Sequence, residues 1–514
     1  MDNIVIIDCG SQFTQLIARR TREMKIHSVV LPWDVTAERV RAQAPSGLII
    51  SGGPDSVNDP GAIALQKEIF ESDVPILGIC YGMQLLAAAL GGRVASGDGH
   101  EYGTTPVKLL GESALFSGVE REFEALMSHG DHVESVPSGF RVAAHTKRGV
   151  TAAMESGDKR RFGLQFHPEV NHTQYGENIL RNFLFNICKC KGDWDLGDWI
   201  ERAVSDIKEQ VGSSHVICGL SGGVDSSVAA ALVNRAIGKQ LECVFVDHGL
   251  LRLNEGQEVL SSYAGLGLSV HSVDASELFL GALEGVTDPE QKRKVIGKLF
   301  IDAFDEASVK IEKLSKTSAA WLLQGTIYPD VIESGGKKKG AAVIKSHHNV
   351  GGLPEHMNMK LLEPLRDLFK DEVREIGRLL GVPSAIVDRH PFPGPGLAVR
   401  CLGHITKERL DTLRAADAIF RDELIAAGLY ESIWQSFCVL LPVRTVGVMG
   451  DGRTYSEVIA LRAVDSADAM TASWTRLPLD LLDLVSKRIC NEVRGVNRVV
   501  MDITSKPPAT IEWE

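Results

Sequence analysis

A short glycine turn in the middle of the chain limits the possible folds more than any other segment. An apolar run, 215–220, leads into the turn, and an alanine-rich segment with helical periodicity, 228–237, follows it. The pattern predicts a strand, a tight turn and a helix N-terminus, which together direct backbone N–H groups and the positive end of the helix dipole at one point. We therefore expect the turn to bind an anion. Its residues are Ser221, Gly222, Gly223, Val224, Asp225, Ser226 and Ser227.

The composition of the turn indicates which anion it binds. Paired glycines let the backbone approach a ligand closely, and the three serine hydroxyls add hydrogen-bond donors. No lysine follows the second glycine, so the turn does not match the common phosphate loop of ATPases. We expect it to hold phosphates that leave together, such as the pyrophosphate of ATP, with Asp225 as a ligand of Mg²⁺. An ordinary strand-to-helix turn without a ligand is the alternative.

The composition of the whole chain is that of a globular enzyme with several domains. Its 514 residues, 44% of them hydrophobic and 24% charged, suffice for roughly two to four domains. The net charge of −12 argues against a general binder of nucleic acids or membranes. The sequence has no apolar run long enough to span a membrane, and the nine cysteines lack the spacing of zinc sites. We expect a cytoplasmic protein with reduced cysteines.

The first part of the chain alternates between strand and helix patterns. Strands are predicted at 4–8, 28–31, 48–51 and 75–79, and helices at 12–24, 36–43 and 62–71. Such alternation produces right-handed βαβ units and a parallel sheet, with the functional site at the carboxyl ends of the strands.

A cysteine follows the fourth of these strands. Cys80 stands at the turn between strand and helix, with Gly78 and Gly82 as its small neighbours. A tight turn of this kind exposes its side chain, so Cys80 is a candidate nucleophile. A backbone N–H of Gly53, in the loop after the third strand, and that of Tyr81 are placed to form an oxyanion hole. A lone cysteine is more often a core residue, so this interpretation depends on a base nearby.

The segment 163–169 supplies that base. It is predicted as a strand that ends in His167, Pro168 and Glu169, and the period of two puts His167 and Glu169 on one side. The carboxylate can then orient the imidazole while the imidazole activates Cys80.

Together, the segments 51–54, 78–84 and 163–169 resemble the class I glutamine amidotransferase family. The segments 101–103 and 127–131 are also similar to parts of this family. The resemblance implies a flavodoxin-like domain with Cys80, His167 and Glu169 as its catalytic triad. It further implies attack on the side-chain amide of glutamine, a glutamyl thioester and release of ammonia.

The middle third begins after a polar stretch, 189–197, that we interpret as a linker. A helix is predicted at 199–211, and strands at 241–246 and 268–273 follow the glycine turn. The end of the strand that closes with Val246 should lie beside the turn, where the base or ribose of a nucleotide would rest. Further on, a glycine-rich basic loop that starts at Lys345 is placed to close over phosphates.

Four segments of this third resemble the ATP pyrophosphatase domain of the GMP synthetase family, a Rossmann-like fold. They are SGGVDSS, FVDHGLLR, QGTIYPDVIES and KSHHNVGGLP. The resemblance implies that ATP adenylates the 2-oxygen of xanthosine 5′-monophosphate (XMP) and that ammonia displaces AMP. The products would be GMP, AMP, pyrophosphate and glutamate, in guanine nucleotide biosynthesis. The cofactor implied is Mg²⁺, with no organic prosthetic group.

The last quarter opens with the rigid segment 390–397, in which three prolines fix the backbone. Helices are predicted at 407–427 and 479–494, and strands at 437–441, 445–449, 457–462 and 499–502, an α+β pattern. The non-repetitive tail suggests a docked end. By resemblance, this region is the dimerisation domain of a homodimer, Lys506 contacts the nucleotide phosphate and Ile511 and Glu512 line the purine. Arg252, in the middle third, is a further XMP contact.

The sequence therefore predicts three α/β or α+β domains. They are a glutaminase at 1–190, an adenylating domain at 191–390 and a smaller dimerising, nucleotide-contacting domain at 391–514. XMP, ATP and glutamine are the expected small-molecule partners. One alternative is a synthetase that makes an amide on a carboxylate acceptor. Another is a non-catalytic nucleotide sensor on the same fold.

Overall fold

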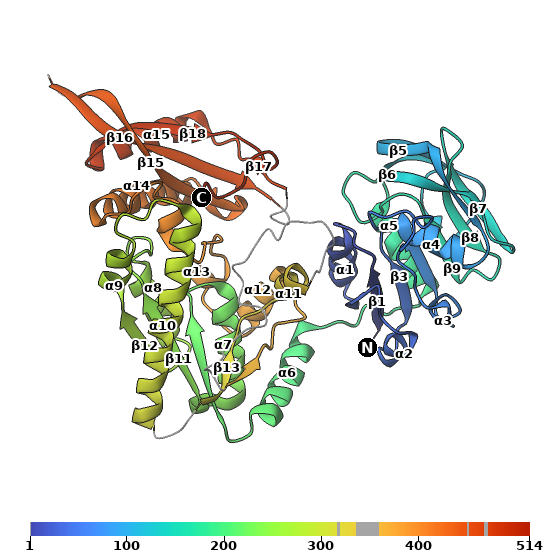
Figure 1. The fold of residues 1–514 in the computed structure, drawn as a ribbon, viewed down its shortest axis with the longest axis horizontal. Helices are drawn as coiled ribbons and strands as arrows, with labels where there is room; N and C mark the ends of the chain where they lie inside the picture. Colours follow the sequence, from blue (N-terminus) through green and yellow to red (C-terminus); the bar gives the residue numbers. More distant parts are fainter. Residues whose placement is uncertain (1, 316–318, 336–358, 450–451, 467–470) are drawn as a thin grey trace. The chain divides into compact units, whose positions relative to one another are not determined.

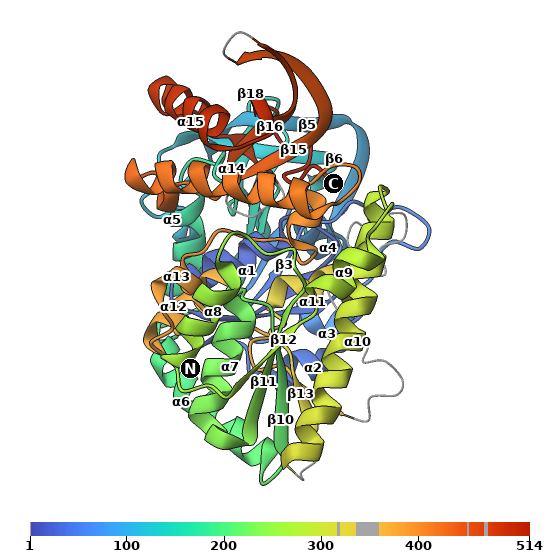
Figure 2. The ribbon, with the colours of Figure 1, turned by 90° about the vertical axis from the view of Figure 1, so that its left-hand side faces the viewer.

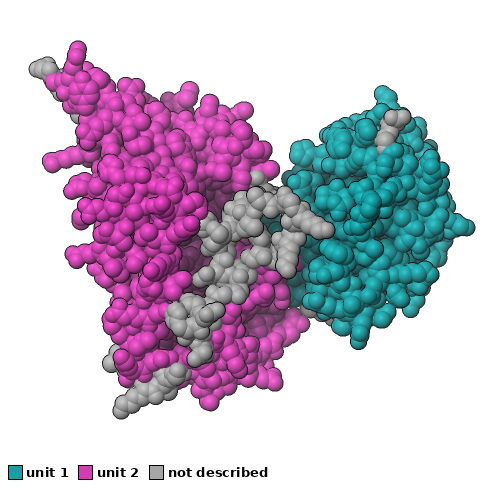
Figure 3. Space-filling model, viewed as in Figure 1, with its two compact units in different colours: residues 1–195, 337–341 teal, residues 196–336, 342–514 magenta. Residues whose placement is uncertain are grey.

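The computed structural model describes residues 2–315, 319–335, 359–449, 452–466 and 471–514. The described residues form two compact units, one that ends at Asp195 and one that begins at Leu196 (Figure 3). The first unit reaches beyond residue 190 because part of the stretch interpreted as a linker packs on it. The Trp194 ring lies 4.6 Å from the Arg22 guanidinium and 4.7 Å from the His27 ring.

The first unit is built on a nine-stranded sheet with the strand order β2-β1-β3-β4-β9-β8-β7-β5-β6 (Figure 1). Strands β1, β2, β3, β4 and β9 are parallel, as the alternating pattern predicts, and the other four are antiparallel. The strands are β1 (Asn3–Asp8), β2 (His27–Pro32), β3 (Gly47–Ile50), β4 (Ile76–Ile79), β5 (Arg93–Leu109), β6 (Glu122–Ser135), β7 (Phe140–Thr146), β8 (Thr151–Ser156) and β9 (Arg161–Leu164). Its α-helices are α1 (Thr14–Glu23), α2 (Ala37–Ala42), α3 (Lys67–Phe70), α4 (Tyr81–Ala89) and α5 (Gly176–Arg181).

The second unit contains a five-stranded, all-parallel sheet with the order β12-β11-β10-β13-β14. Its strands are β10 (His215–Leu220), β11 (Leu241–Asp247), β12 (Val270–Asp274), β13 (Ala319–Leu323) and β14 (Lys360–Leu362). The accompanying helices are α6 (Leu196–Val211), α7 (Val224–Ile237), α8 (Glu255–Ala264), α9 (Ser276–Ala282), α10 (Pro289–Ser315), α11 (Tyr328–Gly335), α12 (Lys370–Leu379) and α13 (Ser384–Val387). Figure 2 shows α7 and α10 along the strands of this sheet.

The same unit carries a second, mostly antiparallel sheet near its C-terminal end. Its strands are β15 (Gln435–Met449), β16 (Gly452–Asp465), β17 (Ser473–Trp474) and β18 (Val496–Asp502), and the helices beside it are α14 (Lys407–Ala426) and α15 (Leu479–Glu492). The two strands predicted at 437–441 and 445–449 are one strand, because an irregularity between Leu441 and Arg444 bends the chain without ending its pairing with β16.

One hydrophobic core joins the two sheets of the second unit. It runs from Ile217 on β10 through Phe304 on α10 and Leu413 on α14 to Ile459 on β16. The α/β and α+β fold class is therefore confirmed, and these two parts share one compact unit. The division of the unit at residue 390 stays a prediction. No helix among the described residues is long and apolar enough to cross a membrane.

Phe304 gives a direct test of this core. Its buried ring lies over Gly219 of β10, 3.4 Å from where a Cβ would stand. We expect Phe304→Ala to destabilise the second unit by about 3–5 kcal/mol, measured as a lower urea midpoint. Val309→Ala, a truncation at a half-exposed site on the same helix, should leave the midpoint almost unchanged, and equal losses would contradict the packing.

Candidate active sites

Cys80 occupies a strained turn between β4 and α4. It is the N-cap of α4 and has φ 51° and ψ −108°, a region that side chains rarely adopt. A Cβ at Gly78 would lie 2.5 Å from the Gly82 carbonyl oxygen, and one at Gly82 would lie 2.2 Å from that of Ile50. Only glycine fits at either position, so the flanking residues allow the turn that places the cysteine at the head of the helix.

The expectation that Cys80 is exposed is wrong. The residue is only 5% exposed, because neighbouring segments cover the turn. Its Sγ lies 3.6 Å from the Ser128 carbonyl oxygen of β6 and 3.7 Å from Nε2 of Gln165. The thiol therefore stands in a buried site with polar neighbours.

His167 and Glu169 complete the arrangement around Cys80. Nδ1 of His167 lies 2.7 Å from Oε1 of Glu169, and both side chains are buried. Burial lowers the pKa of His167, but the charge of Glu169 and hydrogen bonds to Cys80 and Glu169 outweigh it and raise that pKa to about 10. The three side chains can hold a protonated imidazole beside the sulfur.

The sequence predicts that His167 and Glu169 lie on one side of a strand, and the structure places them differently. Strand β9 ends at Leu164, so His167 and Glu169 lie in the loop after it and do not share a strand face. The loop is held by Thr173, whose hydroxyl donates to the His167 carbonyl oxygen at 2.6 Å.

The loop after β3 lies against the same site. A Cβ at Gly52 would stand 3.2 Å from Cε1 of His167, and one at Gly53 would stand 3.0 Å from the Tyr81 ring. Gly53 and Tyr81 are therefore neighbours beside Cys80. Their role as an oxyanion hole stays a prediction.

A second pair of buried titratable groups lies beyond Ser128. Glu101 of β5 and His129 of β6 are paired in register, with Nε2 of His129 3.7 Å from Oε2 of Glu101. Within the described part of the chain, both carboxylate oxygens and this Nε2 lack a hydrogen-bond partner. Burial lowers the pKa of His129 to about 4. The segments that contain these two residues resemble parts of the class I amidotransferase family. No pattern in the sequence predicts the pair itself, because it forms between the two strands of a hairpin.

In the second unit, the glycine turn has the predicted form between β10 and α7. Gly222 has φ +75°, and helix α7 begins at Val224, four residues earlier than predicted. The Ser221 and Ser226 hydroxyls lie 3.1 Å apart at the open side of the turn. The Ser227 hydroxyl is buried and bonds the Gly223 carbonyl oxygen at 2.7 Å and the Tyr263 hydroxyl at 2.8 Å, so it supports the turn from inside.

Lys370 is the residue at this turn that sequence reasoning missed. Its Nζ lies 2.5 Å from Oδ2 of Asp225, although the two are 145 residues apart. A lysine at the first position of a helix, here α12, opposes the helix dipole and is the signal that would have identified it. The pair brings a cation to the glycine turn.

Asp225 also fits the predicted metal site. Its Oδ1 is buried and has no hydrogen-bond partner among the described residues. These residues contain no cluster of three or more His, Cys, Asp or Glu that would enclose a metal ion. A single free carboxylate oxygen suits Mg²⁺, which commonly binds through one or two carboxylates and the phosphates of a substrate.

Two further residues, Val246 and Lys345, are predicted from the sequence to lie near the nucleotide. The side chain of Val246 is buried in the core near the end of β11, and a nucleotide contact of this residue stays a prediction. Lys345 lies outside the described residues.

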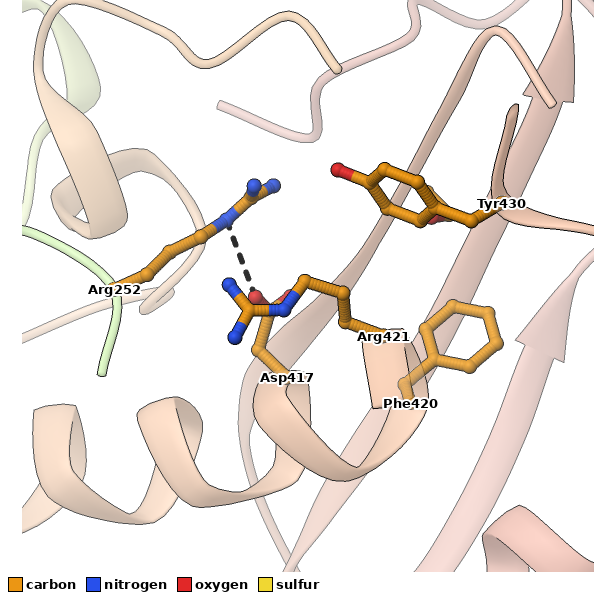
Figure 4. A pocket seen from close by; sticks show the side chains of 6 residues that line it. Arg252, Asp417, Phe420, Arg421 and Tyr430 are labelled. Carbon is orange, nitrogen blue, oxygen red and sulfur yellow. Dashed lines mark ion pairs between the residues drawn. The ribbon is translucent and has the colours of Figure 1, made fainter. Parts of the chain in front are cut away.

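Arg252 lines a small pocket with five residues from the C-terminal part of the unit (Figure 4). Its Nε lies 3.3 Å from Oδ2 of Asp417 on α14, and both side chains are buried. The other lining residues are Phe420, Arg421, Tyr430 and Ser436. Sequence reasoning found Arg252 but not Asp417, which sits in an ordinary amphipathic helix.

The rigid segment 390–397 lies beside this pocket. The Phe392 ring has three guanidinium groups around it, those of Arg252, Arg389 and Arg400, at 4.8, 5.4 and 5.1 Å. Arg389 also donates from Nη1 to the Gly222 carbonyl oxygen at 2.9 Å. One aromatic side chain thus links the glycine turn to the pocket.

The tail residues are docked, as predicted. The Glu512 carboxylate receives Nη2 of Arg400 and Nε2 of Gln435, both at 2.8 Å. Ile511 is buried against Phe437 and Val439 of β15. The backbone N–H of Lys506 donates to the Ala472 carbonyl oxygen at 2.7 Å. The XMP contacts assigned to these three residues stay predictions.

The His167–Glu169 pair generates a test based on pH. Glu169→Gln removes the charge that raises the pKa of His167 and leaves the burial that lowers it, so we expect NMR titration to give a pKa well below the value of about 10. Because the folded-state pKa of the wild type lies above the unfolded value, protonation stabilises the unit below pH 6.5, and this stabilisation is lost as the pH rises towards 10. The variant should lose that dependence.

The matched control is Glu177→Gln, at an exposed carboxylate on α5. It should leave the His167 titration unchanged. A pKa near 10 in Glu169→Gln would show that Glu169 is not the cause.

Comparison with known proteins shows which family the chain belongs to. Family models match residues 5–187 (glutamine amidotransferase class-I), 196–287 (NAD synthase) and 422–513 (GMP synthase C-terminal domain). The glutamine-hydrolysing GMP synthase of Aquifex aeolicus is 54% identical over 511 residues, 99% of each chain. That of Vibrio vulnificus strain CMCP6 is 56% identical over 513 residues, 99% of this chain and 98% of its own. A crystal structure of a putative GMP synthase subunit from Thermoplasma acidophilum, at 30% identity and TM-score 0.34, covers 37% of this chain and 94% of its own. With such identity over nearly the full length of both chains, the protein belongs to the family of glutamine-hydrolysing GMP synthases, which are ligases.

Proposed function

We propose that this protein makes GMP from XMP, ATP and glutamine by two reactions at separate sites. The observation that carries the proposal is the presence of a complete Cys80–His167–Glu169 triad in one unit and a phosphate turn with Asp225 and Lys370 in the other. A nucleotide sensor would need neither the strained cysteine nor its oriented base.

In the first reaction, the Cys80 sulfur attacks the side-chain carbonyl carbon of glutamine. His167 takes the thiol proton and gives it to the departing amide nitrogen, so that ammonia leaves and a glutamyl thioester remains. Glu169 holds Nδ1 of the imidazole at 2.7 Å and stabilises its positive charge. Water, activated by the same imidazole, then hydrolyses the thioester to glutamate and restores the thiol.

In the second reaction, the 2-oxygen of XMP attacks the α-phosphate of ATP and pyrophosphate leaves. The backbone of Gly222 and Gly223, the hydroxyls of Ser221 and Ser226, and the Lys370 cation are placed to bind the departing charge. Ammonia then attacks carbon 2 of the adenylated base, and AMP leaves to give GMP. Mg²⁺, held by Asp225, would neutralise the phosphate charge when it is bound.

The Arg252 pocket, which is too small in this structure to enclose a nucleotide, is part of the site that we propose for XMP. It contains the Arg252 guanidinium and aromatic side chains, and it lies in the same unit as the glycine turn. Arg389 links the pocket region to the turn, because it donates a hydrogen bond to the Gly222 carbonyl oxygen. A synthetase that makes an amide on a carboxylate acceptor would not need the 390–397 segment or the docked tail. Phe392 of that segment contacts Arg252 of the pocket, and Glu512 of the tail contacts Arg400.

Assay of product from XMP, ATP, Mg²⁺ and either glutamine or ammonia tests the proposal. We expect Cys80→Ala to abolish GMP formation from glutamine, because the thioester cannot form, and to leave the rate with ammonia within about twofold of the wild type. Cys190→Ala, which removes a buried cysteine in the same unit, should keep the glutamine-dependent activity.

Two outcomes would count against the proposal. One is a wild-type enzyme that forms no GMP from either nitrogen donor. The other is a folded Cys80→Ala variant that loses ammonia-dependent synthesis as well, which would mean that the two sites are not separable.

We further propose that the protein is a cytoplasmic homodimer. All nine cysteines are free, which agrees with a reducing compartment. The β15–β16 hairpin exposes an apolar strip made of Val446, Val448 and Tyr455. A two-stranded ribbon of this kind is only marginally stable alone, and such a strip is typical of an interface between protomers.

A charge placed in this strip should separate the protomers. We expect Val446→Asp to shift the mass measured by light scattering from dimer to monomer, because the carboxylate would be buried without a partner. Leu379→Asp, at an exposed site on α12, serves as the control and should leave the mass unchanged. A dimer that persists in Val446→Asp at low micromolar concentration would refute this interface.

A further inference from the structure

Lys292 of α10 is completely buried, with 0% exposure. Its Nζ donates to the carbonyl oxygens of Ala398 and Cys401, at 3.1 and 3.0 Å, and to Oε2 of Glu514 at 2.5 Å. An ammonium group has three N–H donors, so these three acceptors satisfy it fully. Neither reaction described above uses this lysine.

The three acceptors belong to segments that are distant in the sequence. Ala398 and Cys401 follow the rigid 390–397 segment, and Glu514 lies in the docked tail. The neighbouring Arg293 strengthens the junction, because its Nη2 donates to the Glu514 carbonyl oxygen at 2.6 Å. A buried ammonium is strongly unfavourable without partners, so the lysine requires the tail to dock at this place.

The same segments carry the side chains assigned to the XMP site. Arg400 lies between Ala398 and Cys401 and forms two hydrogen bonds to Glu512, two residues before Glu514. Arg400 also lies over Phe392, which contacts Arg252 of the pocket. Lys292 itself is not among the residues that line the pocket.

We propose that Lys292 is a positioning residue for XMP: by pairing with Glu514 it fixes the tail, and with it Lys506 and Glu512, against the pocket. The inference rests on the proposed function, in which the tail contacts XMP. Lys292 acts on the nucleotide only through the tail and does not serve the ATP turn, so its loss should affect the two substrates unequally.

Steady-state kinetics with ammonia as the nitrogen donor measure the effect of Lys292 on KM for XMP and on KM for ATP separately. For Lys292→Met we expect KM for XMP to rise at least tenfold and KM for ATP to change less than twofold. Hydrogen exchange of residues 503–514 should become faster. Glu514→Gln keeps an oxygen acceptor but removes the charge, so it should shift KM for XMP in the same direction by a smaller factor. Lys294→Met, an exposed lysine on the same helix, should change neither KM nor exchange.

A double variant tests whether the two side chains act together. If they do, Lys292→Met combined with Glu514→Gln should raise KM for XMP no more than Lys292→Met alone. Equal rises in KM for both substrates, or unchanged tail exchange in a folded variant, would overturn the proposal. Should Lys292→Met fail to fold, an unchanged KM for XMP in Glu514→Gln would overturn it as well.

The failure of this inference can be distinguished from that of the proposed function. A wild-type protein that forms no GMP would refute the function, and the exchange of residues 503–514 would still report whether Lys292 holds the tail. A wild-type protein that forms GMP, with XMP kinetics unaltered by Lys292→Met, would refute only the inference.

Discussion

Three cationic side chains without any exposure, those of Lys292, Arg400 and Arg462, hold the second unit together at its C-terminal end. Each is bound by the tail: Lys292 by Glu514, Arg400 by Glu512, and Arg462 by the Thr504 carbonyl oxygen, with Asp502 at the end of β18 as a second partner of Arg462. Because an unpaired charge is very unfavourable in the interior, the tail must adopt this one path for the unit to fold. The tail is therefore part of the core, and the fold itself fixes the positions of Ile511 and Glu512.

Much of this fold could be predicted from the sequence because local patterns determine it. Strand and helix periods predicted the parallel strands of the nine-stranded and five-stranded sheets, and also the strand, turn and helix around Gly222. The errors lie where tertiary contacts override local signals. Leu441 and Arg444 belong to one strand because β16 continues to pair across the irregularity, which no residue pattern between them indicates.

In the candidate sites, too, local patterns indicate some residues, and only tertiary contacts bring in the others. Cys80 and Asp225 were singled out because each follows a strand in a short, unusual segment, and Arg252 was singled out by resemblance. Their partners Lys370 and Asp417 were missed because they lie on helices far along the chain and look like ordinary surface residues in sequence. The burial of Cys80 could not be predicted either, since it depends on the Ser128 strand and the Gln165 loop closing over the turn.

The cluster around Phe392 has a consequence for how an anion enters. Each of its three guanidinium groups already has its own carboxylate, Asp417 for Arg252, Glu255 for Arg389 and Glu512 for Arg400. The cluster is therefore close to electroneutral before any ligand arrives. A phosphate that bound there would have to displace a carboxylate, because each cation of the cluster already has a partner. Under the proposed function, affinity at this cluster would then depend on the fit of the whole ligand more than on its charge.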